Sequence, residues 1–140
     1  MTRRLWITLA AALAAALAAC GEKATLPPGL FPQTVNGVWT RTELRDLPVD
    51  ESPDPVPRNS VVQIRTAVYK GPGDLQARVY LLDSAEVGAT LGTRWRPSAD
   101  TVFFNHGAYF VVIKWQSPDR KALQEFVADL QKRLGAAGKK

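Results

Sequence analysis

Two patterns of apolar and polar positions recur along the chain, one typical of strands and the other of helices. The strand pattern combines alternation with many β-branched and aromatic residues, between short runs of turn-forming residues. Two turn sequences, Gly71-Pro72-Gly73 and Asn105-His106-Gly107, join neighbouring strands into predicted hairpins. Strands are expected at residues 37–44, 60–70, 75–82, 101–104 and 108–115.

The helical pattern appears twice. The first helix is expected to begin after Asp83 as N-cap and to end at Pro97. Gly88 and Gly92 weaken this helix but would let another backbone approach it closely. The second helix is expected to be capped by Ser117 and stopped by Gly135. In each helix, apolar residues spaced three or four apart form one apolar face. These residues are Val87, Leu91 and Trp95 in the first helix, and Leu123, Phe126, Val127, Leu130 and Leu134 in the second.

The element order β-ββ-α-ββ-α predicts an α+β fold. We expect an antiparallel sheet of about 4–5 strands with two helices packed on one face, a two-layer sandwich. Residues 79–82 and 109–113 are apolar without alternation, so both faces of the central strands must be covered. The N-terminal segment, a dimer mate or a partner protein would cover the second face. If left open, that face would be a binding surface.

The first twenty residues have the pattern of a bacterial lipoprotein signal. Arg3 and Arg4 precede an apolar run over residues 5–19, about 22 Å long as a helix, whereas the hydrocarbon core of a bilayer is about 30 Å thick. The run ends in Leu17-Ala18-Ala19-Cys20, which matches the lipobox, where peptidase cleavage leaves the cysteine as the first residue. The alternatives are an ordinary signal peptide with an incidental cysteine, or an uncleaved anchor.

A lipobox implies a membrane anchor on Cys20. A diacylglycerol would be attached to its thiol through a thioether, and an acyl chain such as palmitate to its amine; several chains make a durable anchor. Gly21 in place of Asp favours the outer membrane, facing the periplasm. The expected organisation is a removed signal peptide at 1–19, a lipidated cysteine and Pro-rich tether at 20–33, one α+β domain at 34–135 with a Pro-rich loop at 48–58, and a basic tail at 136–140.

Composition and charge narrow the possible functions. The 140 residues fit one domain, and the net charge of +5 lies mostly outside it, because 13 basic and 12 acidic residues lie between Asn36 and Leu134. A nucleic-acid binder is therefore disfavoured. A single cysteine excludes an intramolecular disulfide and any metal site built from several cysteines, and a single histidine excludes most other metal sites and catalytic triads. The acidic cluster of Asp50, Glu51 and Asp54 lacks the glycine and the closing glutamate of a calcium-binding loop. From these observations together we predict no catalytic residue, no metal and no cofactor besides the lipid.

Candidate binding residues lie in two places. Arg94, Trp95 and Arg96 put two guanidiniums beside an indole, a set suited to a phosphate, a lipid headgroup or an aromatic ring; the alternative is a plain helix end. Tyr109 and Val111 lie on the strand whose second face needs a cover. The Pro-rich loop at 48–58 is either a docking segment for a partner or a surface crossover.

Five segments of the mature domain combine turn residues with aromatic and β-branched residues: Leu30-Phe31-Pro32 through Trp39, Tyr69-Lys70-Gly71-Pro72-Gly73, Val79-Tyr80, Arg94-Trp95-Arg96-Pro97 and Gly107-Ala108-Tyr109-Phe110-Val111-Val112. Together they resemble a family of uncharacterised bacterial lipoproteins. The resemblance implies kinship of fold over nearly the whole mature domain and brings no catalytic residue with it.

We therefore expect a lipid-anchored protein of the bacterial cell envelope that acts as a non-enzymatic binding or scaffolding module. Its expected partners are the membrane, through the anchor, and an envelope protein or a homodimer mate, but no nucleic acid. The alternative is a carrier of a small apolar ligand or lipid, which needs an enclosed apolar cavity. A hydrolase is disfavoured, because it would need a pocket joining His106 to a carboxylate and a hydroxyl.

Overall fold

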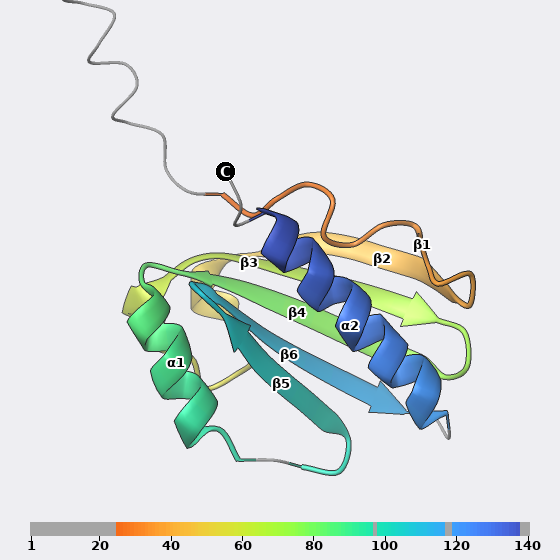
Figure 1. Ribbon diagram of the computed structural model, residues 1–140. Coiled ribbons are helices and arrows are strands. Elements are labelled where there is room, and N and C mark those ends of the chain that lie inside the picture. The colour runs from red at the N-terminus through yellow and green to blue at the C-terminus, as the bar shows by residue number, and fades with distance from the viewer. Residues whose placement is uncertain (1–24, 97, 117–118, 138–140) are drawn as a thin grey trace, which may run out of the picture.

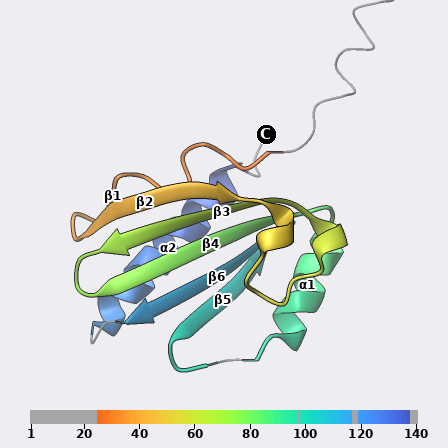
Figure 2. The same cartoon turned by 180° about the vertical axis from the view of Figure 1, so that it is seen from behind.

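A computed structural model describes residues 25–96, 98–116 and 119–137. Six strands form one antiparallel sheet in the spatial order β1-β2-β3-β4-β6-β5, and the sheet curls into a half-barrel (Figures 1 and 2). Register shifts at Arg41/Glu43 and Val61/Gln63 mark β-bulges, which increase strand twist. The elements are β1 Thr34–Val35, β2 Trp39–Leu47, η2 Val49–Glu51, η3 Arg58–Ser60, β3 Val61–Lys70, β4 Asp74–Leu82, α1 Ala85–Arg94, β5 Thr101–His106, β6 Tyr109–Gln116 and α2 Arg120–Ala137.

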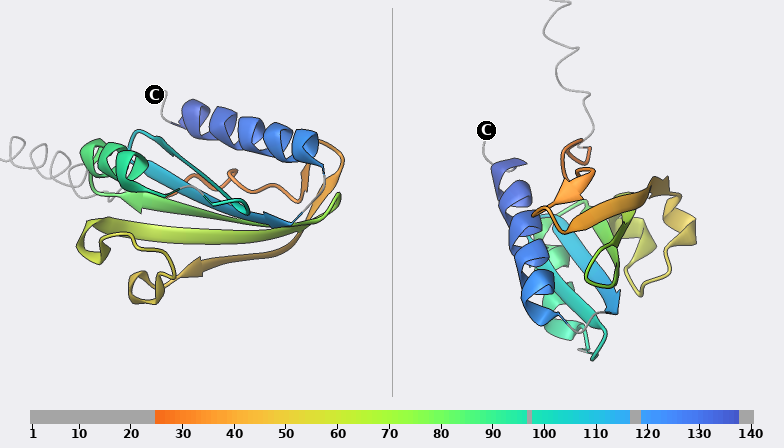
Figure 3. Two further views of the ribbon diagram at one scale, coloured as in Figure 1. Left: turned by 90° about the horizontal axis from the view of Figure 1, so that it is seen from below. Right: turned by 90° about the vertical axis from the view of Figure 1, so that its right-hand side faces the viewer.

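The first core lies between the sheet and α2, which crosses one face of it (Figure 3, left). Phe126 of α2 packs edge-on against Trp39 and Tyr69, with ring centroids 6.0 and 5.0 Å away. The Trp39 indole N–H donates to the carbonyl of Ala122 at 3.3 Å, which ties β2 to the helix. The N-terminal segment completes this core with the buried side chains of Leu26, Leu30, Phe31 and Val35.

The second core lies on the opposite face, towards the end of the sheet where β4 finishes. There the loop between β2 and β3 contributes Val56, and α1 contributes Leu91. The strands contribute their alternate residues to it, principally Ile64, Tyr80, Leu82, Phe110 and Val112. Consecutive apolar residues of β6 thus point alternately into two different cores, which confirms that both faces of the central strands are covered.

The predicted arrangement of four to five strands with both helices on one face is wrong. The sheet has six strands, because residues 34–35 form an extra one too short to show alternation. The helices do not share a core: α2 packs in the first, whereas the apolar face of α1 joins the second. A central strand that is apolar on both sides can receive a helix on either face, so the strand pattern could not decide between them.

α1 lies against the β5–β6 hairpin at the end of the sheet (Figure 1). A Cβ at Gly88 would lie 2.9 Å from the carbonyl oxygen of Gly107, and one at Gly92 would lie 2.8 Å from the Asn105 side-chain oxygen. The predicted close approach of another backbone is confirmed at Gly88, whereas the close neighbour at Gly92 is a side chain. The helix begins one residue later than expected: Ser84 is the N-cap and its hydroxyl accepts from the Val87 N–H at 3.4 Å.

α2 also departs from its predicted ends. The Asp119 carboxylate accepts the Ala122 N–H at 3.0 Å and so caps the helix, which runs past Gly135. The expected cap Ser117 and the expected end of α1 at Pro97 both lie outside the described residues. Neither helix in the described part of the chain combines the length and the apolarity that a membrane crossing requires.

Candidate functional site

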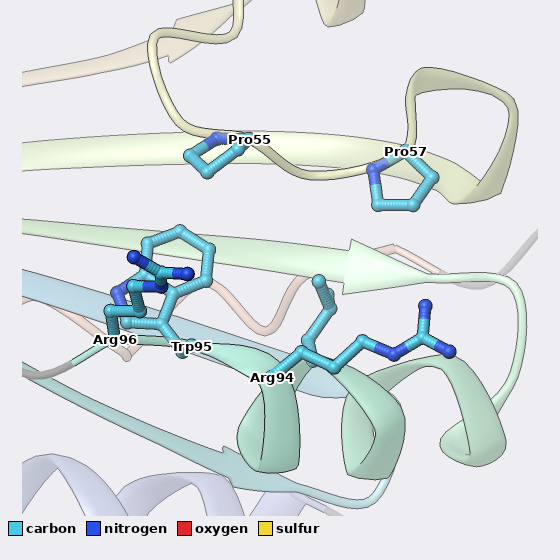
Figure 4. Close-up of a pocket in the computed structure, with 6 residues that line it drawn as sticks. Pro55, Pro57, Arg94, Trp95 and Arg96 are labelled. Carbon is cyan, nitrogen blue, oxygen red and sulfur yellow. The ribbon is translucent and has the colours of Figure 1, made fainter.

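A groove of about 520 Å³ lies between the Pro-rich loop and the C-terminal end of α1 (Figure 4). Pro55 and Pro57 form one wall, and the residues around the end of α1 form the other. The structure thus brings together two segments that the sequence had marked separately, the loop at 48–58 and Arg94-Trp95-Arg96. The six lining residues are Pro55, Pro57, Leu91, Arg94, Trp95 and Arg96.

Trp95 is the fixed aromatic surface of the groove. Its backbone N–H donates to the Leu91 carbonyl at 2.9 Å, which closes the last turn of α1. Its ring centroid lies 5.1 Å from that of Phe110 and 6.0 Å from that of Phe103. One part of the half-buried indole therefore packs in the second core while another part lines the groove.

A buried ion pair holds the opposite wall on the sheet. The Asp54 carboxylate accepts from the Arg78 guanidinium at 2.8 Å and from the Tyr80 hydroxyl at 2.5 Å. The side chains of Arg78 and Asp54 are 7% and 5% exposed. The Ser52 hydroxyl lies 3.1 Å from the same phenol oxygen. We call these four residues the latch, because they fix the loop just before Pro55.

Burial raises the pKa of the Tyr80 phenol, and its hydrogen bond to Asp54 raises it further. Tyr80 therefore stays a neutral donor, and its proton is committed to the Asp54 carboxylate. Burial costs Arg78 one hydrogen bond, because its Nε is buried without a hydrogen-bond partner among the described residues. The latch stabilises the loop through charge and hydrogen bonding, and Val56 adds apolar contact with the second core.

The guanidiniums at the groove are available to a ligand. Arg94 and Arg96 are exposed and form no ion pair within the described ranges, whereas Arg65 and Arg133 are paired to Asp46 at 2.7 Å and to Asp129 at 2.8 Å. The lining residues carry no carboxylate, imidazole, thiol or hydroxyl. Such a surface can bind an anion beside an apolar group, but it offers no side chain suited to proton transfer near neutral pH.

The other predicted residues lie elsewhere. Val111 is fully buried in the first core and Tyr109 is half-buried against it, so neither lines the groove. His106 is exposed at the end of β5, and its ring lies within 4 Å of where a Cβ on Gly135 would be. Asp54 is drawn into the latch, away from the exposed Asp50. Cys20 lies outside the described residues.

Sequence reasoning missed the latch. One signal was present: Arg78 is the single charged residue within residues 75–82, a strand otherwise nearly all apolar. A charged side chain on a buried strand needs a charged partner, and the acids of the Pro-rich loop were among those to which the sequence assigned no role.

Comparison of the chain with protein-family models, with curated proteins and with solved structures finds no match. Within the described ranges, no three His, Cys, Asp or Glu side chains are grouped so as to hold a metal ion.

Proposed function

We propose that this chain is a lipid-anchored, periplasm-facing binding module of the bacterial envelope, and that it binds through the groove between the Pro-rich loop and the end of α1. The observation that carries the binding role is the meeting of Pro55 and Pro57 with Trp95 and with two exposed arginines that form no ion pair in the described ranges. The lipobox ending at Cys20 supports the anchor.

The make-up of the groove favours binding over catalysis. Ligand sites are concave and mostly apolar, with a few polar groups that fix orientation, and this groove matches that description in size and lining. The guanidinium keeps its proton in proteins, so Arg94 and Arg96 supply charge and hydrogen-bond donors but no acid–base chemistry. The carrier alternative needs an enclosed apolar cavity, whereas this groove is open to solvent and rimmed by charge.

The anchor is tested by feeding bacteria a fatty acid that carries a chemical tag. The wild-type chain should become labelled, and Cys20→Ser should lose the label and accumulate unprocessed precursor. Normal labelling of Cys20→Ser would refute the anchor, and the matched variant Thr25→Ser should label like wild type.

The groove is tested by photocrosslinking in living cells. A photoreactive amino acid replaces exposed Pro55 in the groove or exposed Lys121 at the start of α2, across the sheet. We expect a discrete product at position 55 that disappears when Arg94→Gln and Arg96→Gln are added, and no such product at position 121. Products that are the same at both positions, or that ignore the arginine changes, would refute binding through the groove.

A further inference from the structure

The charge and shape of the groove point to the class of its ligand. Building on the proposed function, we infer that the groove binds an acidic peptide segment of an envelope protein, in which an apolar side chain lies between two carboxylates. The apolar side chain would rest on Trp95, and the carboxylates would meet Arg94 and Arg96.

Charge complementarity is the first argument. Arg94 and Arg96 are exposed and without an ion-pair partner in the described part of the chain, and no acidic residue lines the groove. The acid nearest along the loop, Asp54, is buried and already paired with Arg78 at 2.8 Å, so it does not neutralise them. The planar guanidinium matches a carboxylate through two parallel hydrogen bonds, which makes carboxylates well suited to these two residues.

The apolar part of the lining is the second argument. Two guanidiniums alone would bind any small anion, but here an indole lies between them in sequence and the prolines face it across the groove (Figure 4). Packing on Phe103 and Phe110 fixes the indole before a ligand arrives, and the latch fixes the loop. A site organised in advance loses little conformational entropy on binding, so a short segment can be held.

The shape of the groove favours a peptide over a membrane surface. The indole belongs to one wall and faces the prolines of the other, and a flat bilayer would meet the rims of the groove first. Electrostatic adsorption to anionic lipids relies on clusters of about four to eight basic residues, and the groove presents two. In Figure 1 the start of the described chain lies at the upper edge of the domain, whereas the end of α1 lies at its lower edge. An extended segment can enter a groove in that position without the bilayer.

The test uses the full-length lipidated chain in non-ionic detergent micelles. The probe is a set of immobilised peptides with an apolar residue between two Asp or Glu, inside Gly/Ser flanks; the matched set carries Asn or Gln at the acidic positions. We expect the acidic set to bind, and binding to fall at least tenfold in the Arg94→Gln/Arg96→Gln variant. The control variant, Arg120→Gln/Lys121→Gln, removes the same charge from exposed residues of α2 and should bind as wild type does.

A direct readout is the indole NMR signal of Trp95, assigned by its absence in Trp95→Phe. This signal should move when a soluble acidic peptide is added and stay in place with the amide peptide. Equal binding of both peptide sets, or binding unchanged by the arginine changes, would overturn the proposal. So would a shift caused only by phosphatidylglycerol added to the micelles, because that result would assign the groove to lipid headgroups. If position 55 still crosslinks in cells while acidic peptides fail to bind, the ligand class is wrong and the binding role stands.

Discussion

Two glycines one turn apart in α1 allow a sharp test of how this helix is seated. Gly88→Ala and Gly92→Ala make the same chemical change, and each removes a conformational penalty worth about 1 kcal/mol in a helix. They differ in what the new methyl group meets. At Gly88 it would lie 2.9 Å from the backbone oxygen of Gly107, whereas at Gly92 it would lie 2.8 Å from the end of the Asn105 side chain.

The consequence for stability follows from which neighbour can move. Gly107 is the turn residue of the β5–β6 hairpin, with φ at +56°, so its carbonyl is held by the turn. Pushing a methyl group into such a contact costs about 1–3 kcal/mol. Asn105 is exposed and can rotate its amide away at small cost. We therefore expect Gly88→Ala to lower the free energy of unfolding by up to about 2 kcal/mol, and Gly92→Ala to leave it unchanged or raise it by up to about 1 kcal/mol.

The assay is urea unfolding followed by circular dichroism, with both variants and the wild type fitted to a common m-value. A second measurement links the helix to the groove: the indole signal of Trp95 should move in Gly88→Ala, because a displaced α1 carries that residue with it. Equal changes in unfolding free energy for the two variants, or a Gly88→Ala protein more stable than Gly92→Ala, would refute the proposed packing of α1.

Three further predictions concern the latch, a buried phenol and a helix cap. Asp54→Asn leaves the Arg78 charge buried and should cost about 3 kcal/mol in urea unfolding, whereas Asp74→Asn breaks an exposed ion pair and should cost less than about 1 kcal/mol; equal costs would contradict the latch. Burial raises the pKa of Tyr69 from 10.0 to about 12, so the stability that this phenol contributes is complete below pH 10 and is lost as pH rises towards 12. The difference in tyrosinate absorbance between wild type and Tyr69→Phe isolates this phenol: the difference should rise late, towards pH 12, and a difference that rises near pH 10 would argue against its burial. Ser84→Ala should destabilise the protein by about 0.5–1 kcal/mol in the same urea assay, and no change would mean that the hydroxyl does not cap α1.

Local pattern was enough to locate most strands and both helices. The hairpin around Gly71-Pro72-Gly73 is present as predicted, with β3 ending at Lys70 and β4 beginning at Asp74. The second hairpin turns one to two residues later than expected, because the strand pairing extends to His106 and the turn uses Gly107 and Ala108. These features depend on residues close together in the chain, which a single sequence displays directly.

Features that depend on contacts between residues far apart in the chain could not be predicted from local sequence patterns. Both faces of β4 and β6 are apolar, so the sequence required two covers but could not say that the loop and α1 would share one of them. The groove illustrates the same limit. Arg94, Trp95 and Arg96 were marked by their chemistry, but their opposite wall comes from a loop about forty residues earlier that is held by Arg78.

The packing of the N-terminal segment limits the length of linker that a lipid on Cys20 would leave between a membrane and the domain. Leu26 and Leu30 are built into the first core, so residues 25–35 are part of the domain and lend no length to a linker. If the lipid is on Cys20, only five residue steps separate it from Thr25, a span of at most about 18 Å. A linker of that length would hold the domain close to the bilayer surface, and its partner would have to come to the membrane to be bound. Inserting residues before Thr25 would lengthen this linker without changing the packing of the domain.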